Sequence, residues 1–345
     1  MQNIYSYTRE MLEEYFKSIG EKSFKATQVF EWIYQKRINN FNEMTNIKKD
    51  VIEKLENDFD NSFIKIVKRL EDKDTYKYLF ELNDSNHIEA VVMKHTYGNS
   101  VCVSSQVGCN MGCAFCESGR LKKVRNLETF EMVEQILLIE KDLDIRLSSV
   151  VIMGIGEPFD NYDNVIKFLT IINDAKGLAI GARHITVSTS GLVPKILEFA
   201  DFPLQINLAV SLHAPYNELR SKLMPVNKAY DINTLIDTIK KYYAKTNRRV
   251  TIEYVMLDSV NDSLDDANKL AKLLKGLNVY VNLIPYNETN HIEFKATSHE
   301  KVLKFGKVLQ DNGITVTIRR RYGKDIQAAC GQLRSKEVKS WNHFI

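Results

Sequence analysis

Three cysteines stand close together in the middle of the chain, in the string CNMGCAFC. Cys109, Cys113 and Cys116 follow a CxxxCxxC spacing, and the aromatic residue Phe115 directly precedes the last thiol. Three thiolates on one short loop can ligate three irons of a four-iron cluster and leave the fourth iron open to a substrate. A structural zinc site needs four ligands, usually from two pairs, and the nearby histidines lack that spacing. The triplet therefore favours an iron–sulfur cluster over the two alternatives, a zinc site and inert buried thiols.

Length and composition are those of a globular protein. The 345 residues suffice for a barrel plus a small accessory domain, and the 44% hydrophobic and 26% charged residues are ordinary values. No stretch approaches the ~20 apolar residues of a membrane span, and the first residues lack the layout of a signal peptide. We therefore expect a cytoplasmic protein without membrane contact. Because thiols stay reduced there, the five cysteines are expected to be ligands or reactive groups.

The charge of the chain is nearly balanced, with a formal net charge of +3. An acidic partner such as a nucleic acid would have to bind local basic patches. Two candidates are residues 122–125 (KKVR), directly after the cysteine loop, and residues 319–321 (RRR), shortly before the fifth cysteine. Each is typical of a solvated face when taken alone. Their proximity to the cysteines favours contact with a phosphate backbone.

The hydrophobic pattern changes twice along the chain. Up to residue 70 it predicts three short helices, which form a helical accessory domain, and residues 71–100 read as successive strands. From residue 101 to 345, apolar strands alternate with amphipathic helices, which predicts a parallel sheet, either doubly wound or an open barrel. The helices are predicted at 8–20, 25–37 and 46–58, and the later strands at 101–106, 148–154, 183–189, 206–212, 249–257 and 279–285.

Polar residues follow the ends of these later strands. In both architectures the functional residues lie at the carboxyl ends of the strands. The cysteine loop follows the first strand, and IGEP, STSG, SLH and Asn287 follow later ones. Small, acidic and hydrogen-bonding side chains are therefore expected on one rim beside the cluster, where a polar cofactor could bind.

Together these motifs resemble a known family. The CxxxCxxC loop after the first barrel strand is similar to that of the radical S-adenosylmethionine (SAM) superfamily. Nearly the full chain resembles the RlmN family of RNA adenine-C2 methyltransferases, including the N-terminal string FKATQVFEWIYQKR. The other matching strings are VCVSSQVGC, MGIGEPFDN, GARHITVSTSG, SLHAP, RSKLMPVN, VNLIPYN and DIQAACGQLR.

The resemblance implies a fold and a cofactor site. The fold would be α/β, a partial (β/α)6 TIM-like barrel of the radical SAM type with a small N-terminal helical accessory domain. Cys109, Cys113 and Cys116 would ligate one [4Fe–4S] cluster, whose open iron binds SAM. Gly156 and Glu157 would hold the amino group of SAM. The remaining SAM contacts would come from Ser188, Ser211, Leu212, His213 and Asn287.

The resemblance also assigns three catalytic residues. Cys330 matches the methyl-carrying cysteine, Cys102 its partner thiol, and Glu89 the proton acceptor. From the residues alone, Cys102 is better interpreted as a buried apolar thiol, and Glu89 fits a solvent-facing strand residue as well as a base. Cys330 lies near three arginines that would lower the pKa of its thiol. In the implied reaction two SAM molecules are used per turnover, and a transient disulfide between Cys102 and Cys330 releases the RNA.

The implied substrate is an adenosine in the peptidyl transferase centre of 23S rRNA and, in some family members, adenosine 37 of certain tRNAs. Such a base must leave its stack to reach the cofactor. An electron donor such as flavodoxin or ferredoxin would reduce the cluster. Three alternatives are the Cfr branch, which methylates carbon 8 of the same adenosine, a non-catalytic iron–sulfur RNA-binding protein, and a zinc-binding RNA module. The sequence departs from many relatives at Glu117, which the resemblance places in a loop near RNA.

Overall fold

The structure is a computed structural model, and it describes residues 1–289, 292–319, 323, 326–328 and 331–333. A ten-stranded sheet forms its centre, with the order β14-β13-β12-β11-β10-β9-β6-β5-β4-β3. Because the parallel strands follow one another in chain order without a reversal, the sheet winds in one direction, as in a barrel. In the described residues the edge strands β14 and β3 do not pair with each other, so the barrel is open.

Six neighbouring parallel strands form the predicted barrel wall, and a seventh, β14, extends it. The α/β fold with a parallel sheet that the sequence predicts is therefore confirmed. Strand β14 was not predicted, because its four residues are too short for a clear pattern. The parallel strands are β6 (Gly98–Val103), β9 (Leu147–Ile152), β10 (Ile185–Thr189), β11 (Asn207–Ser211), β12 (Val250–Met256), β13 (Val279–Pro285) and β14 (Thr315–Ile318).

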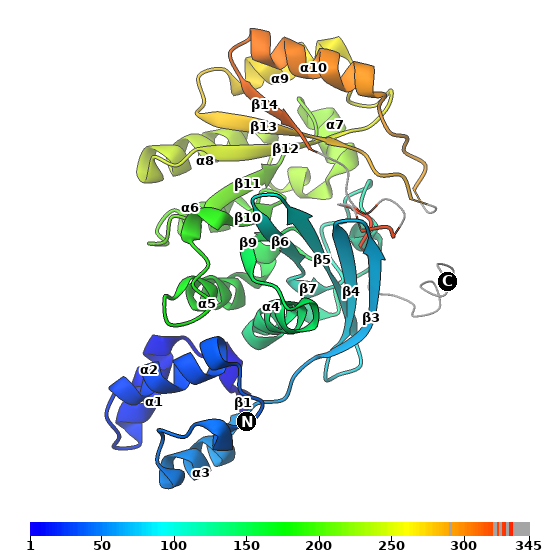
Figure 1. The fold of residues 1–345 in the computed structure, drawn as a ribbon. Helices are drawn as coiled ribbons and strands as arrows, with labels where there is room; N and C mark the ends of the chain where they lie inside the picture. The colour runs from blue at the N-terminus through cyan, green and yellow to red at the C-terminus, as the bar shows by residue number, and fades with distance from the viewer. Residues whose placement is uncertain (290–291, 320–322, 324–325, 329–330, 334–345) are drawn as a thin grey trace.

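Helices separate the parallel strands along the chain and pack on the outside of the sheet (Figure 1). Their apolar residues join the strands in one large buried core. Burial of this apolar area is the main stabilising contribution to the fold. The helices are α4 (Thr129–Leu143), α5 (Tyr162–Asn173), α6 (Val193–Phe199), α7 (Asn217–Leu223), α8 (Ile232–Thr246), α9 (Leu264–Leu274) and α10 (His299–Asp311).

Three antiparallel strands, β3 (Lys65–Asp72), β4 (Thr75–Glu81) and β5 (His87–His95), extend the sheet beyond β6. The sequence predicted β4 and β5 with the turn between them, but it missed β3. Along β3 no residue is fully buried, and its sequence KIVKRLED carries charged residues throughout. Charged side chains are typical of an edge strand and weaken the strand pattern.

The three predicted N-terminal helices are present as α1 (Arg9–Ser18), α2 (Phe24–Glu31) and α3 (Lys49–Asp58). Helix α1 begins at Thr8, whose hydroxyl accepts a hydrogen bond from the backbone N–H of Met11 at 3.2 Å. Short strands β1 (Gln2–Asn3) and β2 (Phe59–Asp60) pair and close this region.

The accessory helices lie below α4 and α5 in Figure 1. An ion pair between Arg9 in α1 and Asp174, just after α5, joins the two parts at 2.9 Å. The domain boundaries at residues 70 and 100 stay a prediction, and strands β3 and β6 run across them. No helix among the described residues is long and apolar enough to cross a membrane.

Candidate active site

The cysteine loop is fixed by its own backbone hydrogen bonds. It lies between β7 (Gln106–Val107) and β8 (Arg125–Asn126), which pair with each other. The N–H of Cys109 donates to the carbonyl of Leu121 at 3.0 Å, and the N–H of Cys116 donates to the carbonyl of Cys113 at 3.1 Å. A side chain at Gly119 would come within 2.8 Å of the backbone nitrogen of Cys113. The protein alone therefore folds the loop tightly enough to present its thiols.

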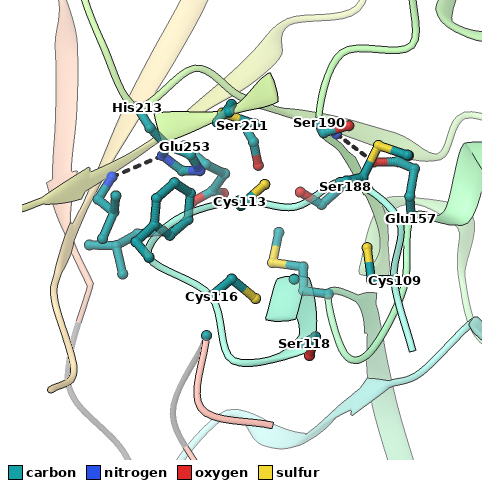
Figure 2. Close-up of a pocket in the computed structure, with 18 of the residues that line it drawn as sticks. Cys109, Cys113, Cys116, Ser118, Glu157, Ser188, Ser190, Ser211, His213 and Glu253 are labelled. Atoms are coloured by element: carbon teal, nitrogen blue, oxygen red, sulfur yellow. Dashed lines mark hydrogen bonds between the residues drawn. The ribbon is translucent and has the colours of Figure 1, made fainter. Parts of the chain in front are cut away.

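The three thiols of this loop line one cavity of about 160 Å³ (Figure 2). The same cavity is lined by residues from the carboxyl ends of the barrel strands, as the strand-end rule predicts. Of the predicted SAM contacts, all but Leu212 line it: Gly156, Glu157, Ser188, Ser211, His213 and Asn287. Leu212 is fully buried in the main core, so only its backbone is available to a cofactor.

The thiols lie in an environment that disfavours their anionic form in the protein alone. Burial, and to a smaller extent the neighbouring thiol of Cys116, raises the pKa of Cys109 to about 12. Burial likewise raises the pKa of Cys113 well above its usual value. A metal cation inside the cavity would stabilise the thiolates against this cost.

Gly156 and Glu157 follow β9 and close one side of the cavity. Glu157 is buried, and its carboxylate accepts hydrogen bonds from the N–H groups of Ser190 at 2.7 Å and Phe159 at 3.0 Å. Burial raises the pKa of Glu157, while these hydrogen bonds lower it. Gly156 has a φ of +114°, and a Cβ there would lie 2.8 Å from the hydroxyl of Ser105. Only glycine satisfies both conditions at this position.

His213 is held as a neutral ring. Its Nδ1 accepts a hydrogen bond from the N–H of Val255 at 3.0 Å, so the proton of the neutral ring is assigned to Nε2. Burial, and then the charge of Arg220, lowers the pKa of His213 to about 3. Phe115 from the cysteine loop contacts the ring edge-on, with centroids 4.7 Å apart. His213 can therefore donate a hydrogen bond to a ligand without carrying charge.

This burial predicts a pH dependence of stability. Because the folded pKa of about 3 lies below the ordinary 6.5, the unfolded chain binds a proton first as the pH falls. Stability from this group is complete above pH 6.5 and is lost as the pH falls toward 3. Between pH 6.5 and 5 the loss should be about 1.5 kcal/mol. His213→Asn keeps a hydrogen-bond acceptor for the N–H of Val255 but has no titrating ring. In anaerobic urea unfolding over this pH range, its free energy of unfolding should therefore fall by that amount less than the free energy of the wild type. Equal losses in both proteins would contradict the assignment.

Arg220 is a site residue that the sequence reasoning missed. Its guanidinium is fully buried, and all five of its hydrogen-bond partners among the described residues are neutral oxygens. Three of these are the carbonyls of Ser190 at 2.7 Å, Ser211 at 3.1 Å and Leu212 at 3.2 Å. Burial lowers its pKa to about 10, which leaves it charged at neutral pH. Arg220 therefore fixes two of the loops that line the cavity. The string RSKLMPVN contains it, but nothing in the string indicates burial.

Replacing Arg220 by lysine should weaken both the fold and SAM binding. Lysine has three donors on a point charge and cannot reproduce the planar fork that reaches these carbonyls. We expect a loss of about 2–3 kcal/mol in unfolding free energy and, because the loops lose their anchor, roughly tenfold weaker SAM binding by calorimetry. Arg183→Lys is the matched control, because Arg183 is exposed. Unchanged SAM binding by Arg220→Lys would show that the loops are fixed by other contacts.

Cys102 and Glu89 lie outside the thiol cavity, on the neighbouring antiparallel part of the sheet. Val91 pairs with Cys102 across β5 and β6, and Glu89 lies two residues before Val91, so both side chains are on one face of the sheet. Glu89 is fully buried, which excludes the solvent-facing alternative. Cys102 packs with Val91, Ile155 and the C-terminal residues Ile326, Ala328 and Leu333 in a small buried cluster.

The C-terminal segment contacts the cysteine loop as well. The N–H of Glu117 donates to the carbonyl of Gly331 at 2.8 Å, and the hydroxyl of Ser118 donates to the carbonyl of Leu333 at 2.7 Å. Gly331 also lines the thiol cavity. The side chain of Glu117 is only 6% exposed, so the change of residue at this position would act on an RNA contact only through the loop, and that effect stays a prediction. The backbone of Glu117 joins this segment to the loop.

Cys330 itself lies outside the described residues, but described residues on both sides of it belong to this segment. Cys102, Cys109, Cys113 and Cys116 form no disulfide among the described residues. A disulfide between Cys102 and Cys330 therefore has no support in the structure and stays a prediction.

The first basic patch, residues 122–125, exposes less positive charge than its sequence suggests. Lys123 pairs with Asp160 at 2.7 Å, and Arg125 pairs with Glu131 and Asp84, each at 2.7 Å. These cations hold the cysteine loop to the barrel, which leaves Lys122 as the exposed cation of the patch. In the second patch Arg319 lines the thiol cavity, while residues 320 and 321 lie outside the described residues.

The donor set of the cavity fits an iron–sulfur cluster with a bound polar cofactor. Figure 2 shows the three thiols around the cavity, with Ser188, Ser211 and Glu157 from the strand ends beside them. Among the described residues, no group of three or more cysteine, histidine or acidic side chains could hold a single metal ion. The protonated Nε2 of His213 makes this ring a donor, so the groups of the cavity that could ligate metal are the three thiols and the carboxylates of Glu157 and Glu253, and of these only the thiols share one loop.

The fold and the thiol cavity define a radical SAM protein. The model of the radical SAM superfamily matches residues 103–274, and a model described as the ribosomal RNA large subunit methyltransferase N-terminal domain matches residues 2–60. A solved radical SAM methyltransferase from Sphaerobacter thermophilus is similar over 97% of this chain and 100% of its own, with a TM-score of 0.91 and 41% identity.

Two curated relatives are similar over nearly the full length. The protein from Acholeplasma laidlawii is 54% identical over 97% of this chain and 99% of its own length. The protein from Enterococcus faecalis is 56% identical over 98% of this chain and 97% of its own length. Both are described as probable dual-specificity RNA methyltransferases, RlmN. The chain therefore belongs to the RlmN family, whose superfamily implies a [4Fe–4S] cluster and SAM.

Proposed function

We propose that this chain is a dual-specificity RNA methyltransferase that methylates carbon 2 of an adenosine in 23S rRNA and of adenosine 37 in tRNA. One observation supports the catalytic assignment most strongly. The segment around position 330 is bound both to the cysteine loop, through Glu117 and Ser118, and to the sheet face that carries Cys102. A residue on this segment is therefore suited to act between the cofactor and a second thiol.

In this proposal the cavity residues hold the cofactors. Cys109, Cys113 and Cys116 would ligate the cluster, and the buried carboxylate of Glu157 would receive the amino group of SAM. When bound, the cluster and SAM supply the one-electron chemistry that an aromatic carbon with no nucleophilic character requires. The stoichiometry of two SAM molecules per turnover follows if one methyl group is loaded on the protein before each RNA is modified.

The residues of the chain then have distinct roles. Cys330 would carry the methyl carbon as a covalent nucleophile. Glu89 would accept the proton from carbon 2 of the RNA-bound intermediate. The thiolate of Cys102 would attack the sulfur of Cys330, so that the electron pair of the sulfur–carbon bond goes to the carbon on the RNA, which takes up a proton to complete the methyl group. The RNA then leaves, and a disulfide remains for cellular thiols to reduce. The cytoplasm supplies both these thiols and an electron donor of the flavodoxin or ferredoxin class.

The target adenosine must leave its stack to enter the cavity. We propose that the N-terminal helical region, up to about residue 70, contacts the folded RNA by its shape and phosphates rather than its sequence. The experiment that tests the function is nucleoside mass spectrometry. Anaerobically reconstituted protein is incubated with SAM, a reductant, and unmodified 23S rRNA or tRNA.

We expect 2-methyladenosine from both RNAs, and none when SAM or the reductant is omitted. 8-Methyladenosine would move the chain to the Cfr branch. Product from rRNA alone would remove the tRNA activity from the proposal. No methylated adenosine from a protein with a complete cluster would favour a non-catalytic RNA-binding role.

A further inference from the structure

A buried lysine lies beside the proposed proton acceptor. Lys77 is in β4, and its side chain is only 4% exposed. Lysine is rarely buried unless its charge is paired. Its Nζ lies 3.1 Å from Oε1 of Glu89, whose side chain is fully buried. The two residues form a charge pair that water does not screen.

The register of the sheet sets this pair in a row with Cys102. Lys77 is paired with Val91 across β4 and β5, and Val91 with Cys102 across β5 and β6. Glu89 lies diagonally opposite Lys77 on the same face, because residues two apart on a strand share a face. One face of the antiparallel strands therefore carries a cation, a carboxylate and a thiol within three neighbouring strands.

Lys77 also contacts the C-terminal segment. Its Nζ donates a hydrogen bond to the carbonyl of Gln327 at 3.2 Å. Gln327 has a φ of +49°, a left-handed conformation that is uncommon for a residue with a side chain. Such a conformation persists where surrounding contacts hold it in place. The lysine thus joins the carboxylate of Glu89 to the segment that leads, three residues later, to Cys330.

Stability alone does not account for this pair. A buried ion pair usually contributes little net stability, and replacing both partners with apolar residues is often neutral or favourable. The neighbours on this face, Val91 and Cys102, belong to an apolar cluster in which such residues would pack well. A functional requirement for charge at this position explains the pair better.

We propose that Lys77 is a positioning residue for the proton acceptor Glu89. It orients one carboxylate oxygen and anchors Gln327, so that the base and the segment carrying Cys330 keep a fixed relation. This inference rests on the proposed function. It assigns Lys77 to one step only, the proton transfer from carbon 2 of the RNA-bound intermediate to Glu89, which precedes release of the RNA.

The test is a single-turnover experiment with the anaerobic holoenzyme and 23S rRNA. Samples are quenched over time, and covalent protein–RNA adduct and released 2-methyladenosine are measured separately. In Lys77→Met, which keeps most of the side-chain volume, adduct should form within about twofold of the wild-type rate. Release should be slowed roughly 10- to 100-fold, because an ill-placed base forfeits part of its catalytic effect. Lys94→Met on the neighbouring strand is the matched control, because Lys94 bonds to Tyr76 and not to Glu89.

A double-mutant cycle separates positioning from packing. If Lys77 acts through Glu89, the variant with both Lys77→Met and Glu89→Gln should release RNA as slowly as Glu89→Gln alone. Lys77→Met alone leaves the buried carboxylate of Glu89 without its cation and could fail to fold. The double variant removes both charges, so the inference can still be tested by comparing it with Glu89→Gln. A double variant that is tenfold slower than Glu89→Gln, or a Lys77→Met protein that releases RNA at the wild-type rate, would overturn the inference. If the wild type makes no 2-methyladenosine, the proposed function itself fails, and the inference with it.

Discussion

Replacing Cys330 by alanine is expected to abolish RNA methylation while the cluster and SAM binding remain. The described residues that line the proposed cofactor cavity include Cys109, Cys113, Cys116 and the strand ends, and Cys330→Ala leaves all of these side chains in place. Removal of a covalent nucleophile typically costs a factor of roughly 10³ or more. The measurement is the rate of methyl transfer to 23S rRNA, beside iron content and SAM affinity of the same preparation.

Cys102→Ala is the matched control for this prediction. Cys102 is buried outside the thiol cavity, in the small cluster that contains the C-terminal residues Ile326, Ala328 and Leu333. Without it the methyl carrier is intact, but the sulfur–carbon bond to RNA cannot be broken by the second thiol. We expect a stable covalent protein–RNA adduct with little released product. Normal methylation by Cys330→Ala would contradict the role of Cys330, whatever the control shows.

Replacing Cys113 by alanine should remove the cluster itself. Cys113 is the middle cysteine of the loop and a proposed cluster ligand, and its backbone carbonyl also accepts the hydrogen bond from the N–H of Cys116. A cluster with two remaining protein ligands should not survive purification, because each thiolate contributes directly to iron binding. We expect iron and sulfide content to fall at least roughly tenfold after anaerobic reconstitution, with loss of the brown colour and of all methylation.

The matched control is again Cys102→Ala, which removes one thiol without touching the cavity. It should keep the iron content of the wild type. The same variant also distinguishes an iron–sulfur cluster from a zinc site. A wild-type protein that binds zinc, and that loses zinc in Cys113→Ala, would contradict the iron–sulfur assignment and favour a zinc-binding RNA module.

Much of the barrel and of the cofactor rim could be predicted from the sequence. Strands β9 to β13 are short apolar segments between amphipathic helices, and this pattern is local. Once the strands are parallel, their carboxyl ends meet on one rim, which brings Glu157, Ser188 and His213 to the cysteine loop. The cluster site could be predicted from the spacing of the three cysteines alone, without the structure.

The residues that sequence reasoning missed depend on contacts across long separations. Arg220 looks like an ordinary helical arginine until its carbonyl partners on three loops are seen. Lys77 is one lysine among many in the chain, and only the register of β4 and β5 places it beside Glu89. Arg125 reads as a solvated charge in the sequence, but it pairs with Glu131 and Asp84 in the fold. Burial of a charged residue has no local sequence signal.

The central claim is that the methyl carbon reaches RNA through the protein. The most direct test uses protein whose methyl carrier has been loaded with deuterium-labelled methyl from labelled SAM and then freed of that SAM. A single turnover is started with RNA and unlabelled SAM, and the released nucleosides are examined by mass spectrometry. The account predicts that the first 2-methyladenosine carries the label from the protein. Unlabelled 2-methyladenosine, with the label still on the protein, would contradict it.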